Sequence, residues 1–238
     1  MRVMVTGAAG RIATLLVPRI RDRFELVLVD RVPAGQDQPT AAPVYEQVDI
    51  CDTEALAAAM AGVDAVIHLA GQVAVRASWD ELRGPNVDGV VSLFEAARTA
   101  GVSRVIFASS NHATGMYDQE QAWPLFPGQP VRPDSLYGAT KAFGEAVGRY
   151  YADQFGLSVI CLRIGWVLAK PHNEQARMMW LSPDDLTRFV CAALASDVGF
   201  GIYYGVSNNA RRRWSIDNAK QDFGYRPVDD SEIYFQAD

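Results

Sequence analysis

Short apolar segments rich in valine and isoleucine recur along the chain, and longer amphipathic stretches separate them. The apolar segments are Val3–Val5, Leu26–Val29, Val44–Val48, Ala65–Leu69, Val105–Ala108 and Val159–Leu162. Within each segment the hydrophobic residues follow one another with little interruption, as in strands that are buried on both faces of a sheet. We therefore predict that these segments are the strands of one central sheet.

The stretches between the strands have the hydrophobic spacing that is typical of helices. The predicted helices are Arg11–Arg23, Glu54–Met60, Val87–Ala100 and Leu136–Phe155. Strands that alternate with helices pair in parallel through right-handed crossovers. The predicted fold class is therefore α/β, a doubly wound, Rossmann-like parallel sheet. Pro18 lies inside the first predicted helix and should kink or shorten it.

This alternation weakens after the last of these strands. We expect a loop over Ala169–Arg177, and then a helix that starts with Ser182 as its N-cap and runs to about Ala195. A short strand near Ile202–Val206 and a last helix around Ile216–Phe223 complete the prediction. We expect a single domain over residues 1–238, with a small C-terminal appendage in which residues 165–238 supply most of the substrate-binding elements.

Composition and charge narrow the classes of partner. The chain has 238 residues, of which 49% are hydrophobic and 21% charged, as in ordinary soluble proteins. Its net charge of −6 opposes binding to nucleic acids and acidic membranes. No stretch approaches the ~18 consecutive apolar residues of a membrane span. We therefore expect a small-molecule substrate, no nucleic acid and no membrane, and interpret the run Arg211–Arg213 as a solvated loop.

The cysteines and histidines show no ligand spacing. Cys51, Cys161 and Cys191 are far apart and odd in number, which argues against a disulfide framework or a zinc site. Each sits in an apolar context, so we expect three reduced core residues and no metal. The chain opens directly on a predicted strand, without a basic segment and an apolar signal region, so we expect a cytoplasmic protein.

A glycine-rich turn, Thr6-Gly-Ala-Ala-Gly-Arg-Ile-Ala13, follows the first predicted strand. Gly7 permits the tight turn from strand to helix, and Gly10 lets the backbone approach a pyrophosphate. The N-terminus of the following helix offers N–H donors and a positive dipole to such an anion. The glycine pattern alone is weak evidence for a dinucleotide site, because strand–helix turns also use glycine for steric reasons. Its place at the start of an α/β pattern favours a dinucleotide site.

An acidic residue ends the second predicted strand, as expected for a dinucleotide site. The Asp30 carboxylate can accept hydrogen bonds from both adenosine ribose hydroxyls and would repel a 2′-phosphate, which favours NAD over NADP. Arg31 is adjacent and offers a phosphate partner, so NADP stays open. The ends of the third and fourth strands, Asp49–Ile50 and Leu69–Gly71, should border the adenine, ribose and phosphates.

A tyrosine and a lysine four residues apart open the predicted helix Leu136–Phe155, which places Tyr137 and Lys141 on one helical face. An ammonium near a phenol favours the phenolate, so Tyr137 can take a proton from a substrate hydroxyl while the carbon gives a hydride to NAD. We expect Lys141 to depress the pKa of Tyr137 and to hold the nicotinamide ribose. Ser110 ends a buried strand, where ligands of open α/β sheets bind, and completes a Ser–Tyr–Lys set.

Together these features resemble the extended branch of the short-chain dehydrogenase/reductase superfamily, the NAD-dependent epimerase/dehydratase family. Further stretches are similar to the uronate dehydrogenases: TGAAG at Thr6–Gly10, FASSNH at Phe107–His112, LYG-x-x-K at Leu136–Lys141, RIG at Arg163–Gly165 and ARMMWLSPDD at Ala176–Asp185. The resemblance spans nearly the whole chain. It implies NAD-dependent oxidation of C1 of a hexuronic acid to an aldarolactone.

The resemblance also implies roles for individual residues. Ser110, Tyr137 and Lys141 would be catalytic, and Ser110, Asn111, His112 and Arg177 would bind the substrate. Arg177 would hold the substrate carboxylate, for which a guanidinium fork is well shaped. The residues expected to bind NAD are Gly7, Ala9, Gly10, Arg11, Ile12, Asp30, Asp49, Ile50, Leu69, Ala70, Gly71, Ser109, Tyr137, Lys141 and Ile164.

Some stretches depart from that family. Gln72–Arg76 lacks the serine by which the family contacts its substrate, and the segment around Arg177 is shorter. The chain stops at Asp238, without the family's C-terminal extension. Asn86 begins a predicted helix; we interpret it as an N-cap rather than as part of a proton relay.

Two other functions remain open at this point. One is a nucleotide-sugar epimerase or dehydratase that keeps its NAD bound, and the other is a non-catalytic dinucleotide-binding protein. Retention of both Tyr137 and Lys141 argues against the second, and the short segment after Leu162 argues against the first. The expectation of a homo-oligomer rests on the resemblance alone, because relatives often pair through the helix that bears Tyr137.

Overall fold

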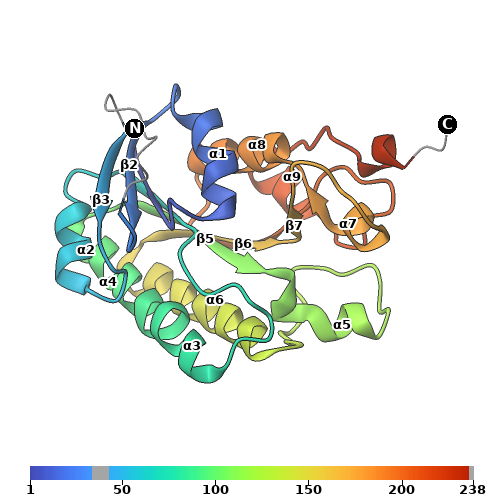
Figure 1. The fold of residues 1–238 in the computed structure, drawn as a ribbon, viewed down its shortest axis with the longest axis horizontal. Helices are drawn as coiled ribbons and strands as arrows, with labels where there is room; N and C mark the ends of the chain where they lie inside the picture. The colour runs from blue at the N-terminus through green and yellow to red at the C-terminus, as the bar shows by residue number, and fades with distance from the viewer. Residues whose placement is uncertain (34–42, 236–238) are drawn as a thin grey trace.

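The computed structural model describes residues 1–33 and 43–235. Its centre is a seven-stranded sheet in the order β3-β2-β1-β4-β5-β6-β9, and every pair of neighbouring strands is parallel (Figure 1). The strands are β1 (Arg2–Thr6), β2 (Glu25–Asp30), β3 (Val44–Gln47), β4 (Ala65–His68), β5 (Arg104–Ser110), β6 (Ser158–Ile164) and β9 (Phe200–Gly205). The order reverses between β1 and β4, which is the switch point of a doubly wound fold. The predicted fold class is confirmed.

Helices cover both faces of the sheet (Figure 1). One face carries α2 (Thr53–Ala59), α4 (Gly89–Ala100) and α6 (Leu136–Phe155), and the other carries α1 (Arg11–Ile20), α8 (Pro183–Leu194) and α9 (Asp217–Phe223). The shorter helices α3 (Trp79–Arg83), α5 (Gly115–Gln119) and α7 (Glu174–Met179) lie in the connections. A small second sheet pairs β7 (Trp166–Val167) with β8 (Trp180–Leu181).

Most predicted elements are present, with shifted ends. Helix α1 ends at Ile20 rather than Arg23, and Pro18 lies in its last turn. Ser182 caps α8 as predicted, because its side chain accepts a hydrogen bond from the Asp185 N–H. The loop predicted over Ala169–Arg177 is wrong in its second half, where α7 begins at Glu174.

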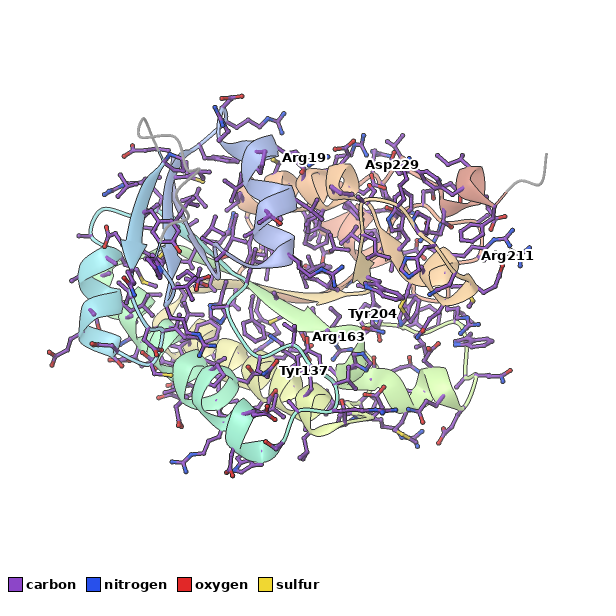
Figure 2. The ribbon with its side chains drawn as sticks, in the orientation of Figure 1. Arg19, Tyr137, Arg163, Tyr204, Arg211 and Asp229 are labelled. Atoms are coloured by element: carbon purple, nitrogen blue, oxygen red, sulfur yellow. The ribbon has the colours of Figure 1, made fainter. Side chains whose placement is uncertain are left out.

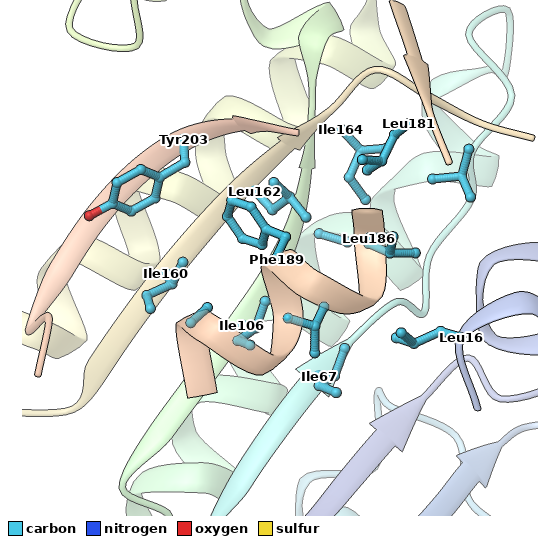
Figure 3. Close-up of a cluster of buried hydrophobic side chains, with 14 of the residues drawn as sticks. Leu16, Ile67, Ile106, Ile160, Leu162, Ile164, Leu181, Leu186, Phe189 and Tyr203 are labelled. Atoms are coloured by element: carbon cyan, nitrogen blue, oxygen red, sulfur yellow. The ribbon is translucent and has the colours of Figure 1, made fainter. Parts of the chain in front are cut away.

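The interior consists of one apolar cluster on each face of the sheet. On the α8 face, Leu186 and Phe189 pack over Ile106 and Leu162 (Figure 3). On the other face, Phe107 of β5 touches α6 so closely that a Cβ on Gly144 would lie 2.2 Å from its ring. Because α6 and Phe107 lie this close together, a larger residue at position 144 would force a shift, and this contact helps to set where the first turn of α6 stands relative to the end of β5.

In the part of the chain that the structure describes, no helix is both long and apolar enough to cross a membrane. Nor does a cluster of three or more metal-ligating side chains occur among those residues. The cysteines are unpaired, but the prediction that all three are core residues holds only for the buried Cys161: Cys191 is half-buried and Cys51 is exposed.

Candidate active site

The glycine-rich turn after β1 packs directly against the end of β4. Gly7 has a φ of +71°, and a Cβ there would lie 2.7 Å from the backbone nitrogen of Ala70. The Gly10 N–H donates to the Gly7 carbonyl oxygen at 2.9 Å, and α1 begins at the next residue. Because Gly10 brings no capping side chain, the first N–H groups of α1 are free to face an anion.

Asp30 ends β2 beside this turn. Its carboxylate accepts hydrogen bonds from the backbone N–H groups of Ala9 at 3.0 Å and Val32 at 3.2 Å. This contact places a negative charge at the edge of the pyrophosphate cradle, where it fits the ribose hydroxyls of NAD and disfavours a 2′-phosphate. Asp49 similarly accepts from the Cys51 N–H at 2.9 Å, and Ile50 is buried against Gly89. The residues present therefore fit NAD.

The end of β4 joins this cradle to α6. Thr6 Oγ1 lies 2.8 Å from Nδ1 of His68 and accepts from the Ala70 N–H at 3.4 Å, which fixes the segment Leu69–Gly71. A Cβ on Gly71 would lie 3.7 Å from Nζ of Lys141. The predicted NAD-binding segment and the predicted catalytic lysine are therefore neighbours.

Lys141 and Tyr137 lie on the first turns of α6, which Ser135 caps by accepting from the Gly138 N–H at 3.0 Å. Nζ of Lys141 donates to the Ala108 carbonyl oxygen at 2.9 Å and lies 5.7 Å from the centre of the Tyr137 ring. Burial lowers the pKa of Lys141 to about 8. Its ammonium therefore still predominates at neutral pH.

The expected lowering of the Tyr137 pKa is wrong for this form of the protein. The phenol is 7% exposed, and burial raises its pKa more than the hydrogen bond with Ser110 lowers it. The physical reason is that a phenolate loses its hydration at this depth, while the ammonium of Lys141 is directed to the carbonyl oxygen of Ala108.

The polar residues after β5 surround the phenol. Ser110 contacts Tyr137, and its hydroxyl also accepts from the His112 N–H at 3.2 Å. The imidazole of His112 packs edge-on against the Tyr137 ring, with the ring centres 5.8 Å apart. Its Nδ1 lies 2.9 Å from both oxygens of Asp134. The structure thus brings Ser110, Asn111 and His112 together with Tyr137 and Lys141, as the sequence predicted.

Asn86 is not a helix cap, contrary to the sequence interpretation. It lies in a π-helical turn, Gly84–Asp88, and is buried. Its Oδ1 accepts from the Gln72 N–H at 2.7 Å, while its Nδ2 donates to the Gln72 carbonyl at 2.9 Å and to Thr140 Oγ1 at 3.1 Å. The Asn86 amide therefore connects the segment after β4 to Thr140 of α6, which lies between Tyr137 and Lys141 in the sequence.

A buried ion pair lies behind the catalytic turn. Arg163 of β6 donates to both oxygens of Glu145 of α6, at 2.8 and 2.7 Å, and Ser109 donates to the same carboxylate at 2.6 Å. Arg163 lies within β6, and its guanidinium is 5.6 Å from the centre of the Tyr204 ring of β9 (Figure 2). Ile164 ends β6 and pairs with Ser110 across the ladder. The RIG stretch is the sequence signal for Arg163, but its partner Glu145 and the role of Asp134 were missed.

Arg177 stands apart from these residues. Among residues 1–33 and 43–235, no hydrogen bond or ion pair joins its side chain to Ser110, Asn111 or His112. Its guanidinium instead binds the carboxylates of Glu232 and Glu174. The predicted role of Arg177 in holding a substrate carboxylate therefore stays a prediction.

A model of the NAD dependent epimerase/dehydratase family matches residues 3–182. The chain belongs to this family. The NAD-dependent glucose-6-phosphate dehydrogenase of Haloferax volcanii is 38% identical over 99% of this chain and 97% of its own length. Uronate dehydrogenase of Pseudomonas putida is 38% identical over 99% of this chain and 87% of its own length.

Solved structures agree with this assignment. A mutant of uronate dehydrogenase from Agrobacterium tumefaciens, complexed with NAD, superposes with a TM-score of 0.90 at 32% identity, covering 98% of this chain and 87% of that one. The expected family, the expected class of NAD-dependent dehydrogenase and the expected cofactor are confirmed. The two curated relatives named above are both dehydrogenases.

Proposed function

We propose that this protein oxidises C1 of a hexuronate to the aldarolactone, with NAD⁺ reduced to NADH. One observation carries the proposal: Ser110, Tyr137 and Lys141 meet at the carboxyl end of β5, directly beside the Gly71 end of the glycine cradle. NAD, when bound, supplies the acceptor for the hydride that leaves C1. The chain itself has to orient the sugar and remove the hydroxyl proton.

Tyr137 is the general base in this proposal. The phenolate form of Tyr137 takes the proton of the C1 hydroxyl as the C–H bond breaks and its electron pair leaves as hydride, so that a neutral phenol and a C=O bond form and the ring becomes a lactone. Burial raises the pKa of Tyr137, so the phenol has to lose its proton before it can act as the base, and the Ser110 hydrogen bond favours that ionisation. In this proposal Lys141 contributes a buried positive charge beside the phenol and also holds the nicotinamide ribose. The other proposed NAD contacts are those predicted from the sequence, and they border the cradle or its strand ends.

A carboxylated sugar is supported by two observations. Arg177 lies in a stretch that resembles the uronate dehydrogenases, and the relatives named above include one of these enzymes. Asn111 and His112 provide polar contacts beside the phenol, and Asp134 orients the imidazole. In this proposal Arg177 holds the far, acidic end of the sugar, while Ser110 holds the reacting end.

A phosphorylated aldose is the second candidate substrate. The glucose-6-phosphate dehydrogenase relative supports it, since it matches over nearly its whole length. Arg177 and Arg211 both pair with Glu232, so displacement of that carboxylate would free two guanidinium groups for a phosphate dianion.

The test is NADH formation with glucuronate, galacturonate, glucose 6-phosphate and glucose, each with NAD⁺ and with NADP⁺. Oxidation of the uronates with NAD⁺ supports the first proposal, and oxidation of glucose 6-phosphate alone supports the second. Stoichiometric NAD in the purified protein would favour the epimerase alternative, because a dehydrogenase has to release NADH in each turnover.

We also propose a homo-oligomer that works in the cytoplasm. The outer side of α6 exposes Phe143, Tyr150 and Phe155, at 36%, 54% and 48% of their surfaces, and unpaired cysteines suit a reducing compartment. Light scattering after gel filtration should give a multiple of the chain mass. A Tyr150→Glu/Phe155→Glu variant should then run as a monomer.

A further inference from the structure

The guanidinium of Arg177 already binds two carboxylates. Its Nε donates to Glu232 Oε1 at 2.7 Å and its Nη2 donates to Glu232 Oε2, so the two side chains form a two-point pair. Nη1 donates to Glu174 Oε1 at 2.9 Å. Every nitrogen of the guanidinium therefore has an acidic partner, and the Arg177 side chain is only 13% exposed.

The charges around Arg177 balance. Glu232 also lies 3.3 Å from Nε of Arg211, so that two acidic and two basic side chains form one cluster. A third carboxylate that approached Arg177 would meet no net positive charge. It would gain from the guanidinium only by displacing one of the two glutamates.

Glu232 is held in place by its backbone. It belongs to the C-terminal turn, Ser231–Tyr234, in which the buried Ser231 donates from its hydroxyl to the Arg177 carbonyl oxygen at 2.5 Å. The N–H of Ser231 donates to Asn209 at 3.2 Å, and the N–H of Glu232 donates to Asp230 at 3.0 Å. The turn is therefore docked on α7, and the carboxylate of Glu232 is presented to Arg177 rather than left to solvent.

From this geometry we infer that Glu232 determines substrate specificity by competing with the substrate carboxylate for Arg177. The inference rests on the proposed function, because it takes Arg177 as the anchor of the acidic end. Glu232 weakens binding of a uronate, which has to displace it, and has no effect on a neutral aldose, which does not need Arg177. The chain accordingly discriminates less between charged and neutral sugars than a free arginine would allow.

The test compares Glu232→Gln with the unaltered protein on glucuronate and on glucose. The expected result is a KM for glucuronate about tenfold lower, with kcat changed less than about twofold and the KM for glucose unchanged. Glu174→Gln removes the other carboxylate without touching the C-terminal turn, and should lower the KM for glucuronate by a smaller factor. An unchanged or higher KM for glucuronate in Glu232→Gln, or an equal shift for glucose, would overturn the inference.

Glu95→Gln is the matched control. Glu95 forms a similar two-point pair with Arg98 on α4, so this variant changes the net charge equally without touching the site. It should leave both KM values unaltered. Calorimetric titration of glucuronate in the presence of NADH adds a readout that does not need turnover. If no variant oxidises a uronate, the proposed function fails; equal affinity of the unaltered protein and Glu232→Gln would reject the competition itself.

Discussion

Glu145 and Arg163 face each other across the interface between α6 and β6, and their side chains are 3% and 1% exposed. The pair, with the Ser109 hydroxyl, connects the helix that bears Tyr137 to the strand ends beneath the site. Both partners of a buried ion pair are needed for stability, because either charge alone would be buried without a counter-charge.

Glu145→Gln should therefore destabilise the protein by about 3–5 kcal/mol, since it leaves the Arg163 guanidinium without its counter-charge. Urea unfolding followed by circular dichroism measures the loss. The exposed pair Glu95–Arg98 provides the comparison, and Glu95→Gln should cost no more than ~1 kcal/mol. Equal losses in the two variants would mean that the buried pair contributes nothing special.

Tyr137→Phe should lower kcat by about 10²–10⁴-fold, because it removes the proton acceptor and leaves the ring in place. The Ser110 hydroxyl keeps its contact with the His112 N–H, so the local fold should persist. Steady-state kinetics with the substrate found in the panel, together with NADH binding by fluorescence, checks both halves. Loss of NADH binding alongside kcat would point to a structural rather than a chemical role.

Asp30→Ala should weaken the binding of NAD⁺ and make NADP⁺ a better cofactor relative to NAD⁺. The reason is that the carboxylate beside the glycine turn repels a 2′-phosphate. We expect the ratio of kcat/KM values for NAD⁺ and NADP⁺ to fall at least about tenfold, equivalent to ~1.4 kcal/mol. An unaltered ratio would show that Asp30 serves only the backbone N–H groups of Ala9 and Val32.

His68 should make stability depend on pH on the acidic side. It is fully buried, and burial together with the nearby Lys141 charge lowers its pKa from 6.5 to about 3. Between these values the unfolded chain binds a proton at His68 that the folded protein does not. The free energy of unfolding should therefore fall as the pH drops below 6.5, by up to about 1.4 kcal/mol per pH unit from this residue.

The measurement is urea unfolding between about pH 7 and pH 4.5 for the unaltered protein and for His68→Gln. The variant lacks the titrating group, so its stability should fall less steeply over this range. Parallel slopes would show that other groups account for the acid sensitivity.

The sequence predicted what depends on local pattern. Strands β1, β2, β4, β5 and β6 are buried on both faces and read as uninterrupted apolar runs, while the Tyr137–Lys141 spacing and the glycine turn are short-range motifs. Consequently the sheet, the cradle and the catalytic turn were all recognisable before the structure.

What the sequence did not reveal depends on long-range packing. Glu145 pairs with Arg163 from 18 positions away, and Arg177 pairs with Glu232 from 55 positions away. The sequence around each of these residues does not indicate which distant residue it pairs with. Asn86 was misread for the same reason, since an asparagine at a helix start is usually a cap and its true partner, Gln72, lies in another segment. Helix α7 was missed because so short a helix shows little periodicity.

The glycine cradle and Asp30 come from the first strands of the chain, whereas Arg177 and Glu232 come from segments after β6. No helix or strand contributes to both groups of residues. Substitutions in the late segments can therefore accumulate over generations without disturbing the dinucleotide half. Related proteins with this arrangement can therefore differ in the sugar that they bind while they keep the same dinucleotide cofactor.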